Sequence, residues 1–462
     1  MDFKKKFIGD KCFYKMLIAV ALPIIIQNGI TNFVSLVDNI MIGRVGTEQM
    51  TGVSVVNQLM WVFNLSIFGL ISGAGIFGAQ FYGKGDEEGM RYTFRFKLML
   101  SVVFSIIAAI VFYVWGENLI SLFLHEGSET GDLEKALYYG KQYLLIMLVT
   151  LLPSAITQSY ASTLRERGQT VVPMVAGVVA VIVNVCLNGV LIFGLFGLPA
   201  LGVAGAAIAT CIARIVEMLV VIVWTHKHST EHSFIKGAYK SLYVPRYLVG
   251  QILLKGTPLM LNEIMWSVGM TFLVQCYSTR GLAVVAALNI SNTLTNLFNV
   301  VFISIGSAIS IIIGQLLGAG KMEEARDIDN KIIFTATSSC IVLGGIVMLI
   351  APLFPQIYNT TDEVKLLATS FLRVSAMFMP VAAFLNAAYF TIRTGGRTFI
   401  TFLFDSVFVW MITVPIAYVL SRYTAVNIIV IFFACQAVDI LKCTIGFFLL
   451  KSRIWLKNIV EE

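Results

Sequence analysis

Twelve long apolar segments constrain the fold of this chain more than any other feature of its sequence. A helix needs about 20 predominantly apolar residues to cross a bilayer. The segments that meet this requirement are residues 16–43, 51–78, 98–116, 136–160, 171–193, 201–224, 256–279, 284–313, 332–352, 366–391, 398–420 and 426–450. Only 13% of the 462 residues are charged, about half the share of a soluble domain. The sequence therefore predicts an all-α polytopic membrane protein with twelve transmembrane helices.

Basic residues predict how these helices are oriented. If the N-terminus is cytoplasmic, most of the 33 Lys and Arg residues fall in the two tails and the even-numbered loops, which is the pattern of cytoplasmic segments. We expect a multi-pass protein of the cell membrane with both termini in the cytoplasm. The first apolar run follows a basic stretch but is too long for a cleaved signal; its lysines are Lys4, Lys5, Lys6, Lys11 and Lys15. The net charge of +7 reflects this topology, and no nucleic acid partner is expected.

The chain repeats itself with an offset of 235 residues over about 70 positions, a period long enough to define a fold. The matched pairs are Pro23/Pro258, Gly46/Gly281, Asn57/Asn292, Asn64/Asn299, Gln80/Gln315, Gly83/Gly318, Gly85/Gly320, Glu88/Glu323 and Arg91/Arg326. A second match relates "RERGQT" at 165–170 to "RTGGRT" at 393–398. Six helices separate equivalent points, so the repeats are parallel and are expected to enclose a central cavity. We predict an N-lobe at 1–235, a C-lobe at 236–462, and alternating access.

The stretch "GAQFYGKG" at 78–85 comes within one residue of a nucleotide-binding phosphate loop. That motif needs a Ser or Thr where this chain has Gly85, and it needs a strand before it. The repeat places "IGQLLGAGK" at the corresponding point with a different spacing of glycines and lysine. A turn that ends a helix explains both copies, because glycine adopts positive φ at a helix C-terminus. We therefore expect no nucleotide site, no cofactor and an energy source other than ATP.

Ionisable side chains inside the membrane are costly and mark candidate functional sites. They are Asp38, Arg214, Glu217, Glu263, Arg373, Asp405, Asp439 and Lys442. Two pairs, Arg214 with Glu217 and Asp439 with Lys442, are three residues apart and are expected to neutralise each other on one helix face. Three carboxylates, Asp38, Glu263 and Asp405, have no such local partner.

Asp38 is a candidate for ion or proton coupling. Asn184 and Asn188 share one face of helix 5, and the distance along each helix brings these amides to a depth similar to that of Asp38. A carboxylate with amide oxygens suits a hard cation or a proton. The alternative is that Asp38 caps the end of the first helix.

Glu263 and Asp405 form a second candidate. Each lies eight residues inside a basic residue at the start of its helix, Lys255 and Arg397 respectively. Both carboxylates are therefore expected about 12 Å into the membrane, where two of them can share a proton or attract a cation. The alternative is that each binds buried polar residues of the second lobe.

Aromatic residues at mid-membrane are candidates for the wall of the substrate cavity, because aromatic faces attract cations. They are Trp61, Trp266 and Trp410, to which we add the repeat-related Asn57 and Asn292. Packing or lipid contact would explain the same aromatic residues. The seven cysteines are scattered without Cys-x-x-Cys spacing, so neither disulfides nor a zinc site are expected.

Together these stretches resemble the multidrug and toxic compound extrusion (MATE) transporters. The resemblance covers nearly the whole chain and rests on "ALPIIIQNGITNFVSLVDNIMIGRVG", "GAQFYGKG", "LRERGQT", "VNVCLNGVLIFGLFGLPALGVAGAAIAT" and "IGQLLGAGK". It implies a two-lobed, twelve-helix exporter that exchanges external Na⁺ or H⁺ for organic, often cationic and amphipathic, compounds. A monomer is expected.

The resemblance also implies a coupling site in the first lobe, formed by Asp38, Asn184, the position of Asn188, and Thr210. The family often has Asp where this chain has Asn188, so one negative charge is missing. Glu263 matches a region of helix 7 that is acidic in other members. Another acidic position, just after the helix 10 turn, is absent, and Asp405 is our candidate to replace it.

Three other functions remain open from the sequence. A flippase of lipid-linked or polysaccharide precursors is the nearest alternative, although such proteins tend to have a more basic cavity. A membrane enzyme is not expected, because all four histidines, His125, His226, His228 and His232, lie in loops. Their stretch "HKHSTEH" could bind a metal, but a solvated loop explains it better, and no metal site is predicted. A receptor or scaffold would show no substrate-driven ion exchange.

Overall fold

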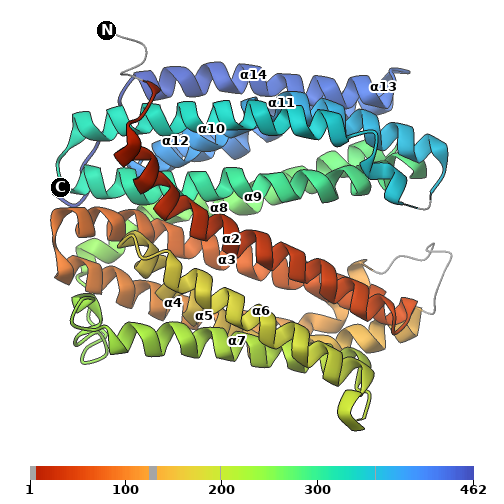
Figure 1. The fold of residues 1–462 in the computed structure, drawn as a ribbon, viewed down its shortest axis with the longest axis horizontal. Coiled ribbons are helices and arrows are strands. Elements are labelled where there is room, and N and C mark those ends of the chain that lie inside the picture. Colours follow the sequence, from red (N-terminus) through yellow and green to blue (C-terminus); the bar gives the residue numbers. More distant parts are fainter. Residues whose placement is uncertain (1–6, 124–132, 198, 359, 462) are drawn as a thin grey trace. The chain divides into compact units, whose positions relative to one another are not determined.

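The computed structural model describes residues 7–123, 133–197, 199–358 and 360–461, and its regular elements there are all helical (Figure 1). Twelve helices are long and apolar enough to cross a membrane, so the predicted fold class is confirmed. The first six are α2 (Lys11–Gly43), α3 (Thr47–Lys84), α4 (Glu87–Phe123), α5 (Leu133–Glu166), α6 (Val171–Phe193) and α7 (Gly202–Lys227). Lys4, Lys5, Lys6 and His125 lie outside the described residues.

The second six helices follow a linker that contains η2 (Ser233–Ile235). They are α8 (Arg246–Ser278), α9 (Leu282–Gly318), α10 (Met322–Ile350), α11 (Asp362–Thr394), a composite helix, and α14 (Ile428–Lys451). The composite helix joins α12 (Thr398–Phe402), two π-helical turns, η4 (Leu403–Val407) and η5 (Val409–Thr413), and α13 (Val414–Tyr423). Short 3₁₀ turns, η1 (Leu195–Gly197) and η3 (Phe354–Ile357), follow α6 and α10.

Several helices are longer than their apolar segments. The predicted segment 98–116 is the middle of α4, which runs from Glu87 to Phe123. The added first turns are charged but have partners: Arg95 donates three hydrogen bonds to linker carbonyls, and Lys97 contacts Glu166. Hydropathy cannot detect a helical turn whose charges are satisfied by other parts of the fold.

Packing divides the chain into two compact units. Unit 1 holds the chain up to Ile25, Ala79–Gly85 and the chain from Leu253 onward; unit 2 holds Ile26–Gly78 and Asp86–Ile252. The start of α2 and the end of α3 therefore pack with much later helices. The predicted lobe limits, 1–235 and 236–462, stay a prediction.

Equivalent helices pack alike in the two units, as the repeat requires. In unit 2, α5 packs against α4 and α7; in unit 1, the corresponding α11 packs against α10 and α14 (Figure 1). Each unit has its own apolar core, formed in unit 2 around Ile67 and Leu144, and in unit 1 around Ile309 and Phe371. These contacts of α5 and α11 are thus repeated in the two units.

The glycine-rich stretches are helix-ending turns. α3 ends at Lys84, and Gly85 has φ of +79°. The corresponding turn after α9 has Gly320 at +74°. Gly168 and Gly396, matched by the second repeat, have φ of +81° and +73°. Because a helix rather than a strand precedes Gly85, the phosphate-loop alternative is excluded.

Candidate functional site

Four polar side chains that the sequence analysis singled out lie together in unit 2. Asn188 on α6 donates through Nδ2 to Asp38 Oδ1 of α2 at 2.6 Å and to Asn184 Oδ1 at 3.1 Å. Asn184 donates in turn to Thr210 Oγ1 of α7 at 3.2 Å. Three helices thus form one chain of hydrogen bonds that ends on a carboxylate, and we call these four residues the Asp38 cluster.

The Asp38 cluster lies in the interior of unit 2. Asn184 and Asn188 are 5% and 1% exposed, and Asp38 is half-buried. α2 continues to Gly43, so Asp38 does not cap the helix. Asn188 Oδ1 is buried and accepts no hydrogen bond, which is an unusual state for a buried polar atom. The cluster therefore offers a carboxylate and an unused amide oxygen, the ligand types that hard cations prefer.

The charged neighbours of the Asp38 cluster neutralise each other. Arg214 Nη1 lies 2.7 Å from Glu217 Oε2 on α7, which confirms the predicted pair. Among the described residues, no ion pair includes Asp38. Its carboxylate accepts a hydrogen bond from the Asn188 amide, and Arg214 acts on it electrostatically from beyond ion-pair distance.

Both carboxylates of unit 1 have partners distant in sequence, as the alternative of buried polar partners in the second lobe expected. Asp405 Oδ1 lies 2.6 Å from Lys442 Nζ of α14. Glu263 Oε1 accepts a hydrogen bond from the Tyr389 hydroxyl at 2.9 Å and lies 4.0 Å from Arg393 Nη1. Lys442 thus forms its ion pair with Asp405 of another helix, and not with Asp439, the partner that sequence spacing predicted. Both carboxylates have counter-charges from distant parts of the chain.

Asn262 connects the two carboxylates of unit 1. Its Nδ2 donates to Asp405 Oδ2 at 3.1 Å and to the Tyr389 hydroxyl at 3.3 Å, and its Oδ1 accepts from Ser406 Oγ at 2.7 Å. Asp405 and Ser406 belong to the π-helical turn η4, a form of helix frequent at functional sites. Sequence reasoning missed Asn262, Tyr389, Arg393 and the role of Lys442. The four-residue spacing of Tyr389 and Arg393 was the available signal.

The predicted cavity residues differ in their surroundings. Trp266 and Trp410 pack against the apolar core of unit 1, and the Trp410 indole donates to the Met265 carbonyl at 2.9 Å. Trp61 and Asn292 are exposed. Asn57 accepts a hydrogen bond from the Tyr143 hydroxyl at 3.4 Å in unit 2. A role in a substrate cavity stays a prediction for all five.

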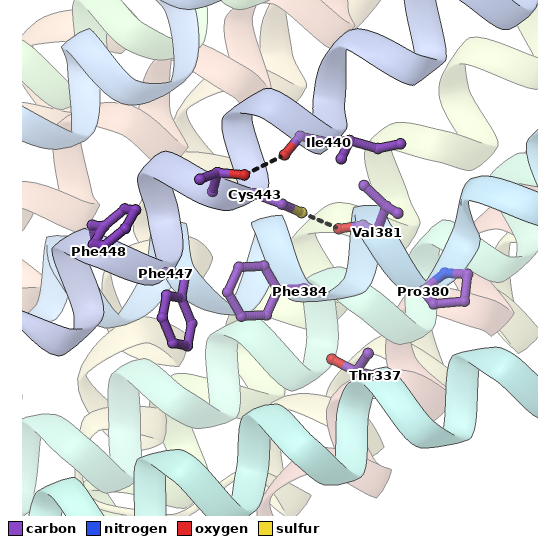
Figure 2. Close-up of a pocket in the computed structure, with 9 residues that line it drawn as sticks. Thr337, Pro380, Val381, Phe384, Ile440, Cys443, Phe447 and Phe448 are labelled. Atoms are coloured by element: carbon purple, nitrogen blue, oxygen red, sulfur yellow. Dashed lines mark hydrogen bonds between the residues drawn. The ribbon is translucent and has the colours of Figure 1, made fainter.

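Unit 1 has a pocket of about 490 Å³ between α10, α11 and α14, and Figure 2 shows the side chains that line it. Its lining is Thr337, Pro380, Val381, Phe384, Ile440, Cys443, Thr444, Phe447 and Phe448. No lining residue is charged, and Ile440, Phe447 and Phe448 are exposed, as lipid-facing side chains are. This pocket lacks the groups needed to bind an ion.

The histidine-rich stretch is packed against other side chains, and the prediction that it lies wholly in a loop is wrong for His226, which belongs to the last turn of α7. His228 stacks on Trp224 with ring centroids 4.3 Å apart, and His226 Nε2 lies 3.3 Å from the Tyr160 hydroxyl. His232 is 3% exposed, so the expectation of solvation is wrong for it. Burial lowers the pKa of the His232 imidazole, and the nearby Arg167 lowers it further. Within the described part of the chain, no three His, Cys, Asp or Glu side chains are placed to share a metal ion.

A comparison with family models gives a match to the family described as MatE over residues 23–190 and 258–419. The two matched ranges begin at the repeat-related Pro23 and Pro258. Together they cover most of the chain.

Curated relatives match over nearly their full lengths. "Probable multidrug resistance protein YoeA" of Bacillus subtilis (strain 168) is 24% identical over 416 residues, which cover 88% of this chain and 87% of the relative. "Probable multidrug resistance protein NorM" of Thermotoga maritima is 23% identical over 450 residues, 96% of this chain and 94% of the relative.

Solved structures show the same fold. One is described as the "Outward-facing conformation of a multidrug resistance MATE family transporter of the MOP superfamily"; it has a TM-score of 0.86, 20% identity and 96% coverage of both chains. A MOP superfamily transporter from Pyrococcus furiosus, described by "Reverse polarity of binding pocket suggests different function", has a TM-score of 0.84, 21% identity and 96% coverage of both chains.

Proposed function

The chain belongs to the MatE family of multidrug and toxic compound extrusion transporters, and from this premise we propose that it is a secondary antiporter. It exports organic, cationic and amphipathic compounds by alternating access, in exchange for Na⁺ or H⁺. Relatives named as multidrug resistance proteins support the efflux of small molecules across the bilayer. We further propose that it works as a monomer with both termini in the cytoplasm, as its basic residues predict.

One observation carries the coupling proposal: among the described residues, Asp38 forms no ion pair within 4.0 Å, whereas Asp405 and Glu263 pair with Lys442 and Arg393. A half-buried carboxylate without a counter-charge in contact attracts a proton or a cation. The carboxylates of unit 1 already have cationic partners, so they attract a further proton or cation less strongly. We therefore place the coupling site at the Asp38 cluster and assign a supporting role to Glu263 and Asp405.

The Asp38 cluster suggests how binding would alter the fold locally. Asn188 Nδ2 donates to both Asp38 and Asn184, while Asn188 Oδ1 accepts nothing. A cation between Asp38 and the amide would be attracted to Oδ1 and would favour rotation of that side chain. Because α2 carries Asp38 and α6 carries the two Asn residues, ion binding changes the attraction between these helices. That differential interaction is the requirement for coupling to a conformational change.

The test is efflux of a fluorescent organic cation from proteoliposomes under an imposed Na⁺ gradient or an imposed pH gradient. A response to one gradient identifies the coupling ion. Asp38→Asn should reduce gradient-driven efflux at least about tenfold, because the carboxylate is the sole charge of the site. Glu263→Gln and Asp405→Asn should also reduce efflux.

The matched control is Asp362→Asn, which alters an exposed carboxylate at the start of α11. It should transport like the unmodified chain. Full coupled efflux in Asp38→Asn, with correct folding shown by gel filtration, would refute the coupling site. Silence of the unmodified chain under both gradients would contradict antiport itself.

A second candidate is the flippase of lipid-linked precursors, and the buried cations of unit 1 favour it. Arg393 and Lys442 are almost fully buried, and buried cations suit anionic substrates such as phosphates. Each, however, already faces a carboxylate. Transfer of a fluorescent anionic lipid between leaflets of the same proteoliposomes would support the flippase, and its absence would support the antiporter.

A further inference from the structure

Residues 452–461, which follow α14 and which we call the strap, are built into unit 1 rather than trailing from it. Trp455 and Ile459 are each 2% exposed. A side chain on Gly395 would have its Cβ 1.9 Å from the Trp455 carbonyl oxygen, so the strap backbone lies directly on the turn after α11. Arg397 Nε donates to the carbonyl that precedes Trp455 at 3.0 Å.

The side chain of Gln80 links the end of α3 to this strap. Its Oε1 accepts from the Ile459 amide at 2.8 Å, and its Nε2 donates to the carbonyls of Lys457 and Thr394 at 3.3 Å each. Gln80 is fully buried. A buried amide side chain with these partners holds three segments together: α3, the strap and the end of α11.

Two further hydrogen bonds extend this link to α9. Lys84 Nζ, at the end of α3, donates to the Val460 carbonyl at 3.3 Å. Asn458 Nδ2, in the strap, donates to the Gly318 carbonyl at the end of α9 at 3.4 Å. The strap therefore bonds to the last turns of both repeat-related helices.

Those two last turns cross at backbone-to-backbone distance. A Cβ on Gly83 would lie 1.9 Å from the Gln315 carbonyl oxygen, and a Cβ on Gly318 would lie 1.9 Å from the Gln80 carbonyl oxygen. The two contacts are exchanged by the 235-residue repeat offset. Backbones this close leave no room for water between the two helix ends. The ends of α3 and α9 would have to separate for the protein to open between them.

We propose that the strap is a latch that holds the end of α3 against α9, and that its release is a step in opening this side of the transporter. The inference rests on the proposed function, because alternating access requires each side to open in turn. α3 is suited to this role: its residues up to Gly78 pack in unit 2, whereas Ala79–Gly85 pack in unit 1. If the units move relative to each other, the contacts of this segment are among those that would have to change.

The experiment is amide hydrogen exchange, read by mass spectrometry, on the full chain in lipid nanodiscs. Gln80→Leu keeps the side-chain volume roughly constant and removes two hydrogen bonds to the strap and one to the Thr394 carbonyl at the end of α11. The amide exchange rates of residues 79–85 and 314–321 should both rise about tenfold, because each hydrogen bond contributes only a modest net free energy. Asn458→Ala alters the strap itself and should raise exchange in the same two segments by a smaller factor.

The control is Arg453→Ala, which removes an exposed ion pair between the strap and Glu323 of α10. It should leave 79–85 and 314–321 unchanged. If Gln80→Leu does not fold, Asn458→Ala decides the question. Faster exchange confined to 452–461, or no change at all, would overturn the latch.

The same variants, in nanodiscs for hydrogen exchange and in proteoliposomes for efflux, separate this inference from the antiport proposal. If ion gradients drive no efflux but the helix ends open as described, the latch stands and the antiport fails. If efflux is coupled but the helix ends do not respond, the latch fails and the antiport stands.

Discussion

Replacing either member of the Lys97–Glu166 ion pair should destabilise the protein strongly. Lys97 Nζ of α4 lies 2.7 Å from both carboxylate oxygens of Glu166 on α5, and it also donates to Thr163 Oγ1 at 2.9 Å. The side chains are 0% and 7% exposed. Each charge is thus removed from solvent, and each depends on the other.

The expected magnitude follows from this burial. Loss of one partner of a buried pair costs about 3–5 kcal/mol, because the remaining charge is left without compensation. Lys97→Met and Glu166→Gln should each show a loss of that order. The double variant should lose much less than the sum, because neither charge remains. The exposed pair Lys141–Glu117, at 52% and 53% exposure, is the control, and its loss should cost at most about 1 kcal/mol.

The assay is the free energy of unfolding, measured by titration with SDS in mixed micelles for the four members of each double-mutant cycle. A coupling energy for Lys97–Glu166 well above that of Lys141–Glu117 is the expected result. Equal coupling in the two cycles would refute the reasoning, since burial is what distinguishes the pairs. Additive single losses would refute it as well.

Three further outcomes are expected. His232 is held neutral in the folded chain because burial lowers its pKa, so stability should fall as pH drops below the ordinary histidine range, and His232→Phe should flatten that slope in unfolding titrations. Gly318→Ala should disrupt packing because its Cβ would meet the Gln80 carbonyl, whereas Gly345→Ala, with open space around it, should be neutral or stabilising by up to about 1 kcal/mol, as thermal melts will show. Asp329 is buried and accepts a hydrogen bond from a threonine hydroxyl; Asp329→Asn keeps an acceptor there and should change the unfolding free energy by less than about 1 kcal/mol.

The fold could be predicted because its signals are local. Each membrane crossing is a continuous apolar run, and the helix-ending turns that the repeat relates have a glycine at positive φ, such as Gly85 and Gly320. The repeat adds a second, independent signal, since equivalent turns occur at equivalent points. What hydropathy could not supply was the charged first turns of α4, whose partners lie in the linker after α7.

The candidate site was predictable only in part, for a physical reason. Asn184 and Asn188 are four residues apart on one helix face, and helix rise alone gives the depth of Asp38, so their proximity could be expected. The partners of Glu263 and Asp405 could not be. Arg393 and Lys442 reach them from other helices, and their choice of partner depends on tertiary packing that sequence spacing does not encode.

Unit 1 combines the start of α2 with helices that are synthesised much later, which has a consequence for folding during synthesis. Apolar residues of α2, among them Phe13, Leu17 and Ile24, are buried against α9 residues such as Ile309 and Ile312. Ribosomes add about 5–20 residues per second, so on the order of tens of seconds separate the emergence of these two helices. During that interval the first helix waits in the bilayer with its packing face covered only by lipid. A chain interrupted before α9 would display that face permanently, and it offers membrane quality control a simple mark of an unfinished transporter.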